Sequence, residues 1–421
     1  MTGHTPAPIP PERGKVMQSS GRSSRYRSLL AAGAALVLLT AGCGDDAADK
    51  GATENFDVLF IGGVTGPAAT TVAATTKALD AAAKSINENG GVKGRNVVIK
   101  VKDSQGDARR AVSLLQEELS GNNLPDVVIP SGTSAEALAM VPLLTRSKIT
   151  SVAFGASPLL NDPQKYPYHF QSVPNSAAQL TGLRKHLESK GAKRLGLLVS
   201  QDEYGKGVVQ AVKTQLEGSG IEVKNFEFVP TDIDLSVSYR RMLDANPDFA
   251  YIDTTGDAAT RLLQARVQTG AVNIPTIAGS GMSLTAGGPF KYGSPEANKN
   301  LEILVFKVEV AVPEAQQSPV FKDFLTRYSG GQPIQNSLST PSLAWDQLRL
   351  IAAAASSDGA LKDLPTSLVQ AVYNLKVPDG YWLTEKQYTF TKDKHTPTPT
   401  PDDFPFIPSS AQVNGQYQVG S

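Results

Sequence analysis

Two short segments carry the residue types that bind a small acidic ligand. Segments 131–134 (Ser-Gly-Thr-Ser) and 155–158 (Gly-Ala-Ser-Pro) each follow a short apolar run. Hydroxyl groups and free backbone N–H groups at a helix start bind anions, and small residues let a ligand approach the backbone. Two such turns side by side would form a carboxylate-binding site. The turns alone favour a simpler interpretation, in which Ser134 and Ser157 only cap helices.

Motifs for other chemistries are absent from the sequence. No turn matches the dinucleotide or P-loop pattern, and no HExxH spacing is present. A hydrolase needs a nucleophile with a base. Ser131 and Asp253 are conceivable members, but no GxSxG motif and no suitably placed histidine accompany them. We therefore predict no catalytic residue, no cofactor and no metal site, and the chain is not expected to be an enzyme.

The charge balance and the cysteine content narrow the function further. The 421 residues include 40 basic and 40 acidic side chains, so the formal net charge is zero. Without a basic excess to neutralise phosphates, a nucleic-acid partner is not expected. The single cysteine excludes an intramolecular disulfide and a CxxC site.

Residues 1–42 are expected to be an export signal. Arginines at positions 22, 25 and 27 precede an apolar run over 29–41, which is shorter than the roughly 20 residues of a membrane-spanning helix. Small residues then lead to Cys43, as in a bacterial lipobox, so Cys43 is predicted to be the lipidated first residue of the mature protein. The alternative is a plain secretory signal with an incidental cysteine. Residues 43–55 are small and polar and predict a flexible tether.

From residue 56 onward, apolar runs alternate with segments of helical periodicity. This alternation predicts parallel sheets with helices on both faces, in more units than one domain holds. We therefore predict an α/β fold of two doubly wound lobes, in which ligands bind beyond the carboxyl ends of the strands. Predicted strands are at 56–62, 96–101, 126–130, 150–154, 194–199, 221–229, 248–253 and 274–278.

Several motifs recur in the order and spacing of one known family. They are Thr65-Gly66-Pro67, Ile86-Asn87 followed by Gly90-Gly91-Val92, Gly155-Ala156-Ser157, Asp202-x-Tyr204-Gly205-x-Gly207, Asp248-Phe249, Gln264-Ala265-Arg266 and Tyr388-x-Phe390. On these motifs the chain resembles, over roughly 56–395, the branched-chain amino-acid (leucine/isoleucine/valine) binding proteins. These are type I periplasmic, or solute-binding, proteins of ABC importers.

The resemblance implies a fold and a mechanism. The two lobes would be joined by a three-crossover hinge, with lobe I formed by 56–174 plus 306–385 and lobe II by 175–305 plus 386–421. Members of the family close around a small ligand by hinge motion and then dock on a membrane permease.

The resemblance also implies ligand contacts in lobe I. Ser131 and either Thr133 or Ser134 match the hydroxyl turn that holds the ligand carboxylate. Ala156 and Ser157 match its partner turn.

In lobe II the matching positions depart from the amino-acid binders. Tyr204 matches the aromatic side chain that covers the ligand, and Asp253 and Thr255 lie in another contact segment. Ser280 stands where amino-acid binders keep a carboxylate for the ligand's ammonium group, and a serine cannot neutralise that charge. Either Asp253 replaces the missing charge or the ligand has no ammonium group, as in binders of aromatic acids, amides and short carboxylates.

The sequence thus predicts an extracytoplasmic solute-binding lipoprotein. We expect a monomer, lipid-anchored to the outer face of the cell membrane, which delivers an amino acid or a small carboxylate or amide to ABC permease subunits with a cytoplasmic ATPase. A ligand sensor of the same fold without a permease is the main alternative, and a hydrolase is a weaker one.

Overall fold

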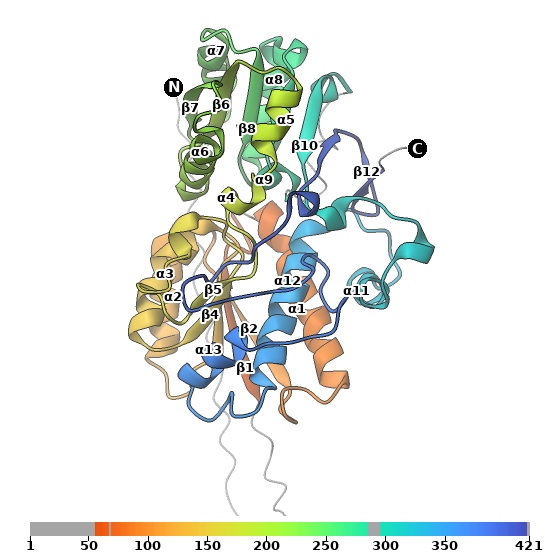
Figure 1. Ribbon diagram of the computed structural model, residues 1–421. Helices are drawn as coiled ribbons and strands as arrows, with labels where there is room; N and C mark the ends of the chain where they lie inside the picture. The colour runs from red at the N-terminus through yellow and green to blue at the C-terminus, as the bar shows by residue number, and fades with distance from the viewer. Residues whose placement is uncertain (1–54, 67–68, 285–294, 419–421) are drawn as a thin grey trace, which may run out of the picture. The chain divides into compact units, whose positions relative to one another are not determined.

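The computed structural model describes residues 55–66, 69–284 and 295–418. The predicted export signal, Cys43 and the tether up to residue 54 lie outside the described residues. Figure 1 shows two α/β lobes, each with helices packed on both faces of a central sheet. No helix of the described chain combines the length and the apolar content needed to cross a bilayer.

Lobe I is built on a parallel five-stranded sheet. Its strand order is β2-β1-β3-β4-β5. The strands are β1 (Phe56–Gly62), β2 (Val97–Asp103), β3 (Val127–Pro130), β4 (Thr150–Ala153) and β5 (His169–Gln171). Helices α1 (Ala69–Glu88), α11 (Pro319–Ser329), α12 (Ser339–Ala355) and α13 (Thr366–Tyr373) belong to one face, and α2 (Ala108–Leu119) and α3 (Ser134–Arg146) to the other.

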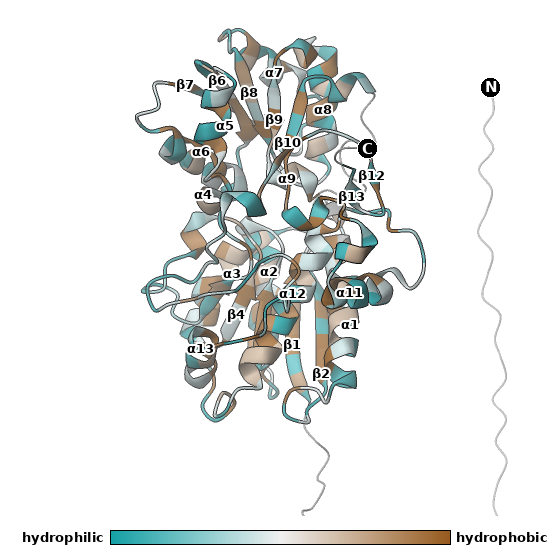
Figure 2. Ribbon diagram, turned by 45° about the vertical axis from the view of Figure 1, so that its right-hand side comes forward, coloured by the Kyte–Doolittle hydropathy of each residue, from teal (hydrophilic) through white to brown (hydrophobic). Residues whose placement is uncertain are grey.

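The alternation of side chains along β1 explains the two layers of helices. Phe56 and Phe60 join the core that contains α1 and α12, whereas Leu59 and Ile61 join the core beneath α2 and α3. A strand that is apolar on both faces must be covered on both faces, which is why residues 58–61 are continuously apolar. Figure 2 shows the same pattern as brown strands between helices of mixed colour.

Lobe II has a six-stranded sheet with one antiparallel edge. Its order is β11-β10-β9-β8-β6-β7, and only β11 runs against its neighbour. The strands are β6 (Arg194–Ser200), β7 (Glu222–Phe228), β8 (Phe249–Asp253), β9 (Thr276–Ala278), β10 (Leu301–Leu304) and β11 (Phe406–Pro408). Helices α5 (Leu183–Ser189) and α6 (Glu203–Leu216) cover one face, and α7 (Ser236–Leu243) and α8 (Ala258–Gln268) the other.

Three crossovers join the lobes, and the buried carboxyl group of Glu309 fixes one of them, whereas that of Asp346 fixes residues 383–384 against α12 within lobe I. Asp346 of α12 accepts hydrogen bonds from the backbone N–H groups of Leu383 and Thr384 at 2.8–3.0 Å. Glu309, just after β10, accepts from the backbone of Phe306 and from Ser283 of lobe II, both at 2.9 Å, and from Ser337. Burial raises the pKa of Asp346 to about 6 and that of Glu309 to about 7.

The C-terminal segment contacts both lobes. We expected residues 386–421 in lobe II, and β11 does extend the sheet of that lobe. The part around His395, however, lies on lobe I. The His395 carbonyl accepts from the Gln171 N–H at 2.8 Å, its Nδ1 lies 2.7 Å from the His169 carbonyl, and its ring stacks on Phe170.

His169 makes the stability of lobe I sensitive to acid. Burial lowers its pKa from 6.5 to about 3, so the unfolded chain binds the proton first and stability falls as the pH drops below 6.5. His169→Gln removes this proton-binding group. We expect the destabilisation caused by this substitution, measured by urea unfolding, to shrink by about 2 kcal/mol between pH 7.5 and pH 5.

A neighbouring substitution provides the control. Thr150→Val alters an equally buried side chain of the same sheet that carries no titratable group. Its effect on the unfolding free energy should be the same at both pH values. An equally pH-independent effect of His169→Gln would contradict the prediction.

Candidate ligand-binding site

A cleft of about 270 Å³ takes its lining from both lobes. Apart from Leu284, which comes after β9 and a short helix, its residues follow the carboxyl ends of β2, β3 and β4 in lobe I and of β6, β7 and β8 in lobe II. The carboxyl end of a parallel sheet is where α/β proteins bind ligands. The lining consists of Gly106, Gly132, Thr133, Ser134, Ala135, Phe154, Ala156, Asp202, Tyr204, Pro230, Thr231, Thr255, Gly256 and Leu284.

The cleft brings together residues predicted from both lobes. The predicted residues that line it are Thr133, Ser134, Ala156, Tyr204 and Thr255. The remaining predicted ligand contacts, Ser131, Ser157, Asp253 and Ser280, are buried and do not line it.

A buried carboxylate engages the hydroxyl groups of the first turn. Glu136 of α3 accepts hydrogen bonds from Ser131 at 2.6 Å, from Thr133 at 2.8 Å and from Ser104. Ser131 adopts a φ of 66°, a strained value for a residue other than glycine, and this φ belongs to the turn that lets the three hydroxyl groups converge. The Ser131 and Thr133 protons are therefore directed at Glu136 rather than at the cleft.

The start of α3 still offers donors to the cleft. Thr133 is its N-cap, yet no side chain caps the first turn. The N–H groups at a helix start have no partner inside the helix, and the helix dipole adds partial positive charge there. Ser134 accepts a hydrogen bond from the Ser157 N–H at 3.2 Å, which leaves its own proton to donate. Ser134 and Ala135 can thus present three donors to an anionic or carbonyl oxygen.

Ser157 acts as a helix cap. Its Oγ accepts from the Leu159 N–H at 3.3 Å at the start of the short helix η1 (Pro158–Leu160). Gln171 donates to the carbonyl groups of Gly155 and Ser157 at 2.7 and 3.1 Å, which holds this turn against β5. The Ser157 side chain therefore caps a helix, as the simpler interpretation of this turn predicts. Ala156, the residue before it, lines the cleft.

In lobe II, Tyr204 forms the cleft surface above a buried acid. Its hydroxyl donates to Asp253 Oδ2 at 3.0 Å, and Tyr251 donates to the same oxygen at 3.3 Å. Oδ1 of Asp253 has no partner among the described residues. Burial raises the pKa of Asp253 to about 7 and the pKa of Tyr204 well above its usual value.

The turn after β9 seals this acid from the cleft. A Cβ at Gly279 would collide with the Asp253 carboxyl group, and one at Gly281 would collide with the Tyr204 hydroxyl and lie 2.8 Å from Asp253 Oδ1. Only glycine fits at these two positions. Between them, Ser280 turns away and donates to Gln179 Oε1.

Two of the lining residues that were not singled out as ligand contacts from the sequence shape the wall of the cleft. Asp202 is the N-cap of α6, and its Oδ1 accepts from the Gly205 N–H at 2.9 Å and from Ser200 at 3.0 Å. Phe154 packs so closely on Gly132 that an added Cβ there would lie 2.6 Å from the ring. Asp202 opens the motif that also contains Tyr204, so the sequence carries a signal for it. Phe154 ends an apolar run that predicts a strand and gives no sign of ligand contact.

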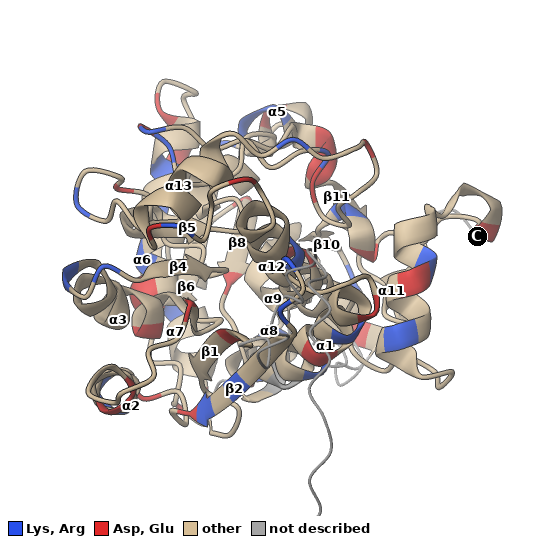
Figure 3. Cartoon of the chain, turned by 90° about the horizontal axis from the view of Figure 1, so that it is seen from below, with Lys and Arg blue, Asp and Glu red and all other residues tan. Residues whose placement is uncertain are grey.

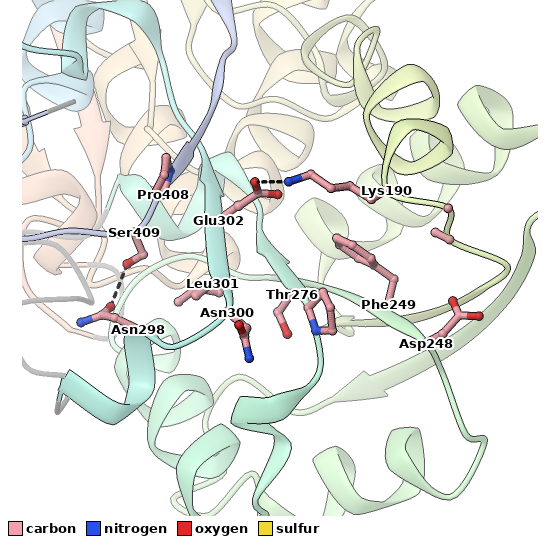
Figure 4. A pocket seen from close by; sticks show the side chains of 13 residues that line it. Lys190, Asp248, Phe249, Thr276, Asn298, Asn300, Leu301, Glu302, Pro408 and Ser409 are labelled. Carbon is pink, nitrogen blue, oxygen red and sulfur yellow. Dashed lines mark hydrogen bonds and ion pairs between the residues drawn. The ribbon is translucent and has the colours of Figure 1, made fainter. Parts of the chain in front are cut away.

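A larger pocket of about 570 Å³ lies at the opposite, amino ends of β8, β9 and β10 (Figure 4). Its polar groups already pair with one another. Glu302 contacts Lys190 at 3.0 Å and His186 at 2.7 Å, and Ser409 donates to Asn298 at 2.7 Å. The hydrogen bond from His186 is the main reason that the pKa of Glu302 falls to about 2. We therefore favour the smaller cleft.

The charged side chains of the described residues are spread over the molecule and form no metal site. Figure 3 shows the charged residues mainly on helices and loops, with the strands largely uncharged. Within the described residues, no group of three or more His, Cys, Asp or Glu side chains could hold a metal ion.

The sequence matches the family model of the periplasmic binding proteins over residues 57–400. Since the match spans most of the chain, the protein belongs to this family, and its relatives confirm the resemblance noted above. A Leu/Ile/Val-binding protein, BraC3 of Rhizobium johnstonii, is 25% identical over 329 residues, which cover 75% of this chain and 86% of that protein.

Solved structures share the fold at lower identity. LivJ of Streptococcus pneumoniae in complex with isoleucine has a TM-score of 0.66 at 18% identity, covering 86% of this chain and 99% of that chain. An ABC-transporter solute-binding protein of R. palustris in complex with benzoate has a TM-score of 0.71 at 15% identity, covering 85% and 94%. The fold is therefore that of the type I periplasmic binding proteins.

The buried acid of lobe II gives a test of this geometry. The raised pKa of Asp253 means that the unfolded chain loses this proton first, so stability declines as the pH rises from about 4 to 7. Asp253→Asn keeps the hydrogen-bond acceptor for both tyrosines and cannot ionise. Relative to the parent protein, its unfolding free energy should rise by about 2 kcal/mol between pH 5 and pH 8. Substitution of the exposed Asp257 by Asn should bring no such gain, and a constant difference for Asp253→Asn would refute the assignment.

Proposed function

We propose that this protein is the solute-capturing subunit of an ABC importer. It binds a small amino acid or a related carboxylate or amide between its lobes and delivers it to a membrane permease powered by a cytoplasmic ATPase. The observation that carries the proposal is the cleft lined by strand ends from both lobes. Membership of the periplasmic binding proteins supports the same function.

Ligand capture would work by hinge closure. A ligand held at the start of α3 gains contacts with Tyr204 and Thr255 only when lobe II approaches. Its binding free energy therefore favours the closed state and shifts the population toward it. The three crossovers, one of them held by Glu309, are the segments about which the lobes turn.

The lining indicates a small ligand with an oxygen-bearing end. A volume of about 270 Å³ lies just below the usual 300–1,000 Å³ of ligand sites. Phe154 and Leu284 offer apolar contact, and the start of α3 offers donors. Amino acids and compact carboxylates or amides have this combination of an apolar body and an acceptor.

Cys43 would hold the protein at the membrane after export. A lipid-modified cysteine followed by the polar segment 44–55 keeps the lobes close to a permease while leaving them free to move. Stable anchoring takes more than one acyl chain, so a diacylated or triacylated cysteine is expected.

The start of α3 provides a direct test of ligand binding. Ser134→Ala removes one donor to the ligand and should weaken binding by about tenfold, as the loss of a hydrogen bond to a charged group does. Isothermal titration with a panel of amino acids, short carboxylates and amides measures the effect. Ser172→Ala, a buried serine of lobe I outside the cleft, serves as the control and should leave the affinity unchanged.

Closure itself can be measured by small-angle X-ray scattering. The radius of gyration should decrease when a ligand of the panel binds. If no compound of the panel produces heat or compaction, the proposed function is wrong.

The anchor can be tested in the producing cell. Cys43→Ser should move the protein from the membrane fraction to the soluble extracytoplasmic fraction. Its thermal unfolding should not change, because Cys43 precedes the first strand. Equal membrane retention of the variant would argue against lipidation.

A further inference from the structure

The cleft wall carries one acidic side chain and no basic one. Among the described lining residues, Asp202 is the only carboxylate, and no lysine or arginine lines the cleft. The phenol of Tyr204 is engaged with Asp253. A charged group of the ligand can therefore meet an opposite charge in the described wall only at Asp202.

The other acids near the cleft are shut off from a ligand. Asp253 lies beneath Tyr204 and Gly281, with about 1% of its surface exposed. Glu136 is fully buried and accepts the hydroxyl groups of Ser104, Ser131 and Thr133. Neither lines the cleft, so neither can pair with a ligand in this conformation.

The carboxylate of Asp202 is held in place through one of its two oxygens, and the other oxygen accepts no hydrogen bond from the described residues. Oδ1 receives both hydrogen bonds, from the Gly205 N–H and from Ser200. Oδ2 has no hydrogen-bond partner among the described residues. Lys206, one turn further along α6, pairs instead with Glu203 at 2.6 Å on the exposed side of the helix. A rigid carboxylate with one available oxygen is preorganised for a cationic partner.

We propose that Asp202 is the residue through which lobe II recognises a positively charged nitrogen of the ligand. The uncapped start of α3 in lobe I takes the acidic or carbonyl end of the same molecule. This inference rests on the proposed function. It names Asp202 as the residue that makes the cleft prefer a ligand with a cationic group. Of the two alternatives that the sequence left open, Asp253 as the ammonium contact or a ligand without an ammonium group, it replaces the first with a contact at the first strand-to-helix turn of lobe II.

The placement of the two groups couples charge recognition to closure. Each lobe holds one end of a dipolar ligand, so both contacts form only when the lobes come together. Closure also removes water, which strengthens the attraction between Asp202 and a cation. An anion without a cationic group leaves Asp202 desolvated and unpaired, and that state is strongly unfavourable. Simple carboxylates are therefore selected against.

Matched ligand pairs test the proposal. Leucine and 4-methylpentanoate differ only in the amino group, as do phenylalanine and 3-phenylpropanoate. By isothermal titration at pH 7.5, at least one amino acid should bind about 100-fold more tightly than its desamino partner, as expected for an unpaired buried charge. Benzoate should behave like the desamino acids.

The substitution Asp202→Asn isolates the charge from the helix cap. Asparagine keeps the Oδ1 acceptor for Gly205 and Ser200, so the melting temperature should stay within a few degrees of the parent value. Affinity for the amino acid should fall about 100-fold, while the desamino acid should bind as well as before or better. Asp107→Asn alters an equivalent N-cap, at α2 outside the cleft, and should leave both affinities within threefold.

Three results would overturn the assignment. The first is a desamino acid that binds as tightly as its amino acid. The second is amino-acid binding that survives Asp202→Asn but is lost in Asp253→Asn. In these two cases the protein still captures a solute and the proposed function stands. The third is the absence of heat and compaction with every compound, which refutes the proposed function together with this inference.

Discussion

The structure depends on one constraint of parallel sheets, namely that every strand ends at the same edge. In each lobe that edge gathers the strand-to-helix turns, where backbone N–H groups and small side chains are exposed. Apart from Leu284, which comes after β9 and a short helix, the cleft lining follows six of these strand ends, three from each lobe. A site divided between two sheets needs a hinge, and the hinge in turn needs crossovers that hold their shape while the lobes move.

Buried acids hold one crossover and two segments of lobe I in place without cations. Glu136, Glu309 and Asp346 each accept hydroxyl or backbone N–H groups, and within the described residues none of them forms an ion pair with lysine or arginine. Such donor clusters satisfy a carboxyl group in a dry interior and fix its neighbours. Glu309 also links Ser283 of lobe II to Ser337, just before α12 of lobe I. Glu309 holds a crossover by the same kind of contact with which Glu136 withdraws the hydroxyl groups of Ser131 and Thr133 from the cleft.

The sequence predicted the layers of the fold better than the directions of side chains. Apolar runs followed by glycine turns identified β1, β3 and β8, whereas β5 (His-Phe-Gln) has no apolar run and is fixed by His395 from a distant segment. The turn after β3 was recognised as a candidate site, but nothing local indicates that Glu136 collects its hydroxyl groups. Asp202 follows β6 and Asp253 ends the neighbouring β8, and the cover of Tyr204 and Gly281 over Asp253 leaves only Asp202 in the cleft wall.

The glycines on either side of Ser280 also restrict how this lobe can change its preference. With no space for a side chain at 279 or 281, variation in that turn is confined to the single residue between them. A longer acidic side chain at 280 would have to break the contact with Gln179 before it could approach a bound molecule. Substitutions that alter the preferred solute therefore have more room in the first strand-to-helix turn of lobe II than in the turn after β9.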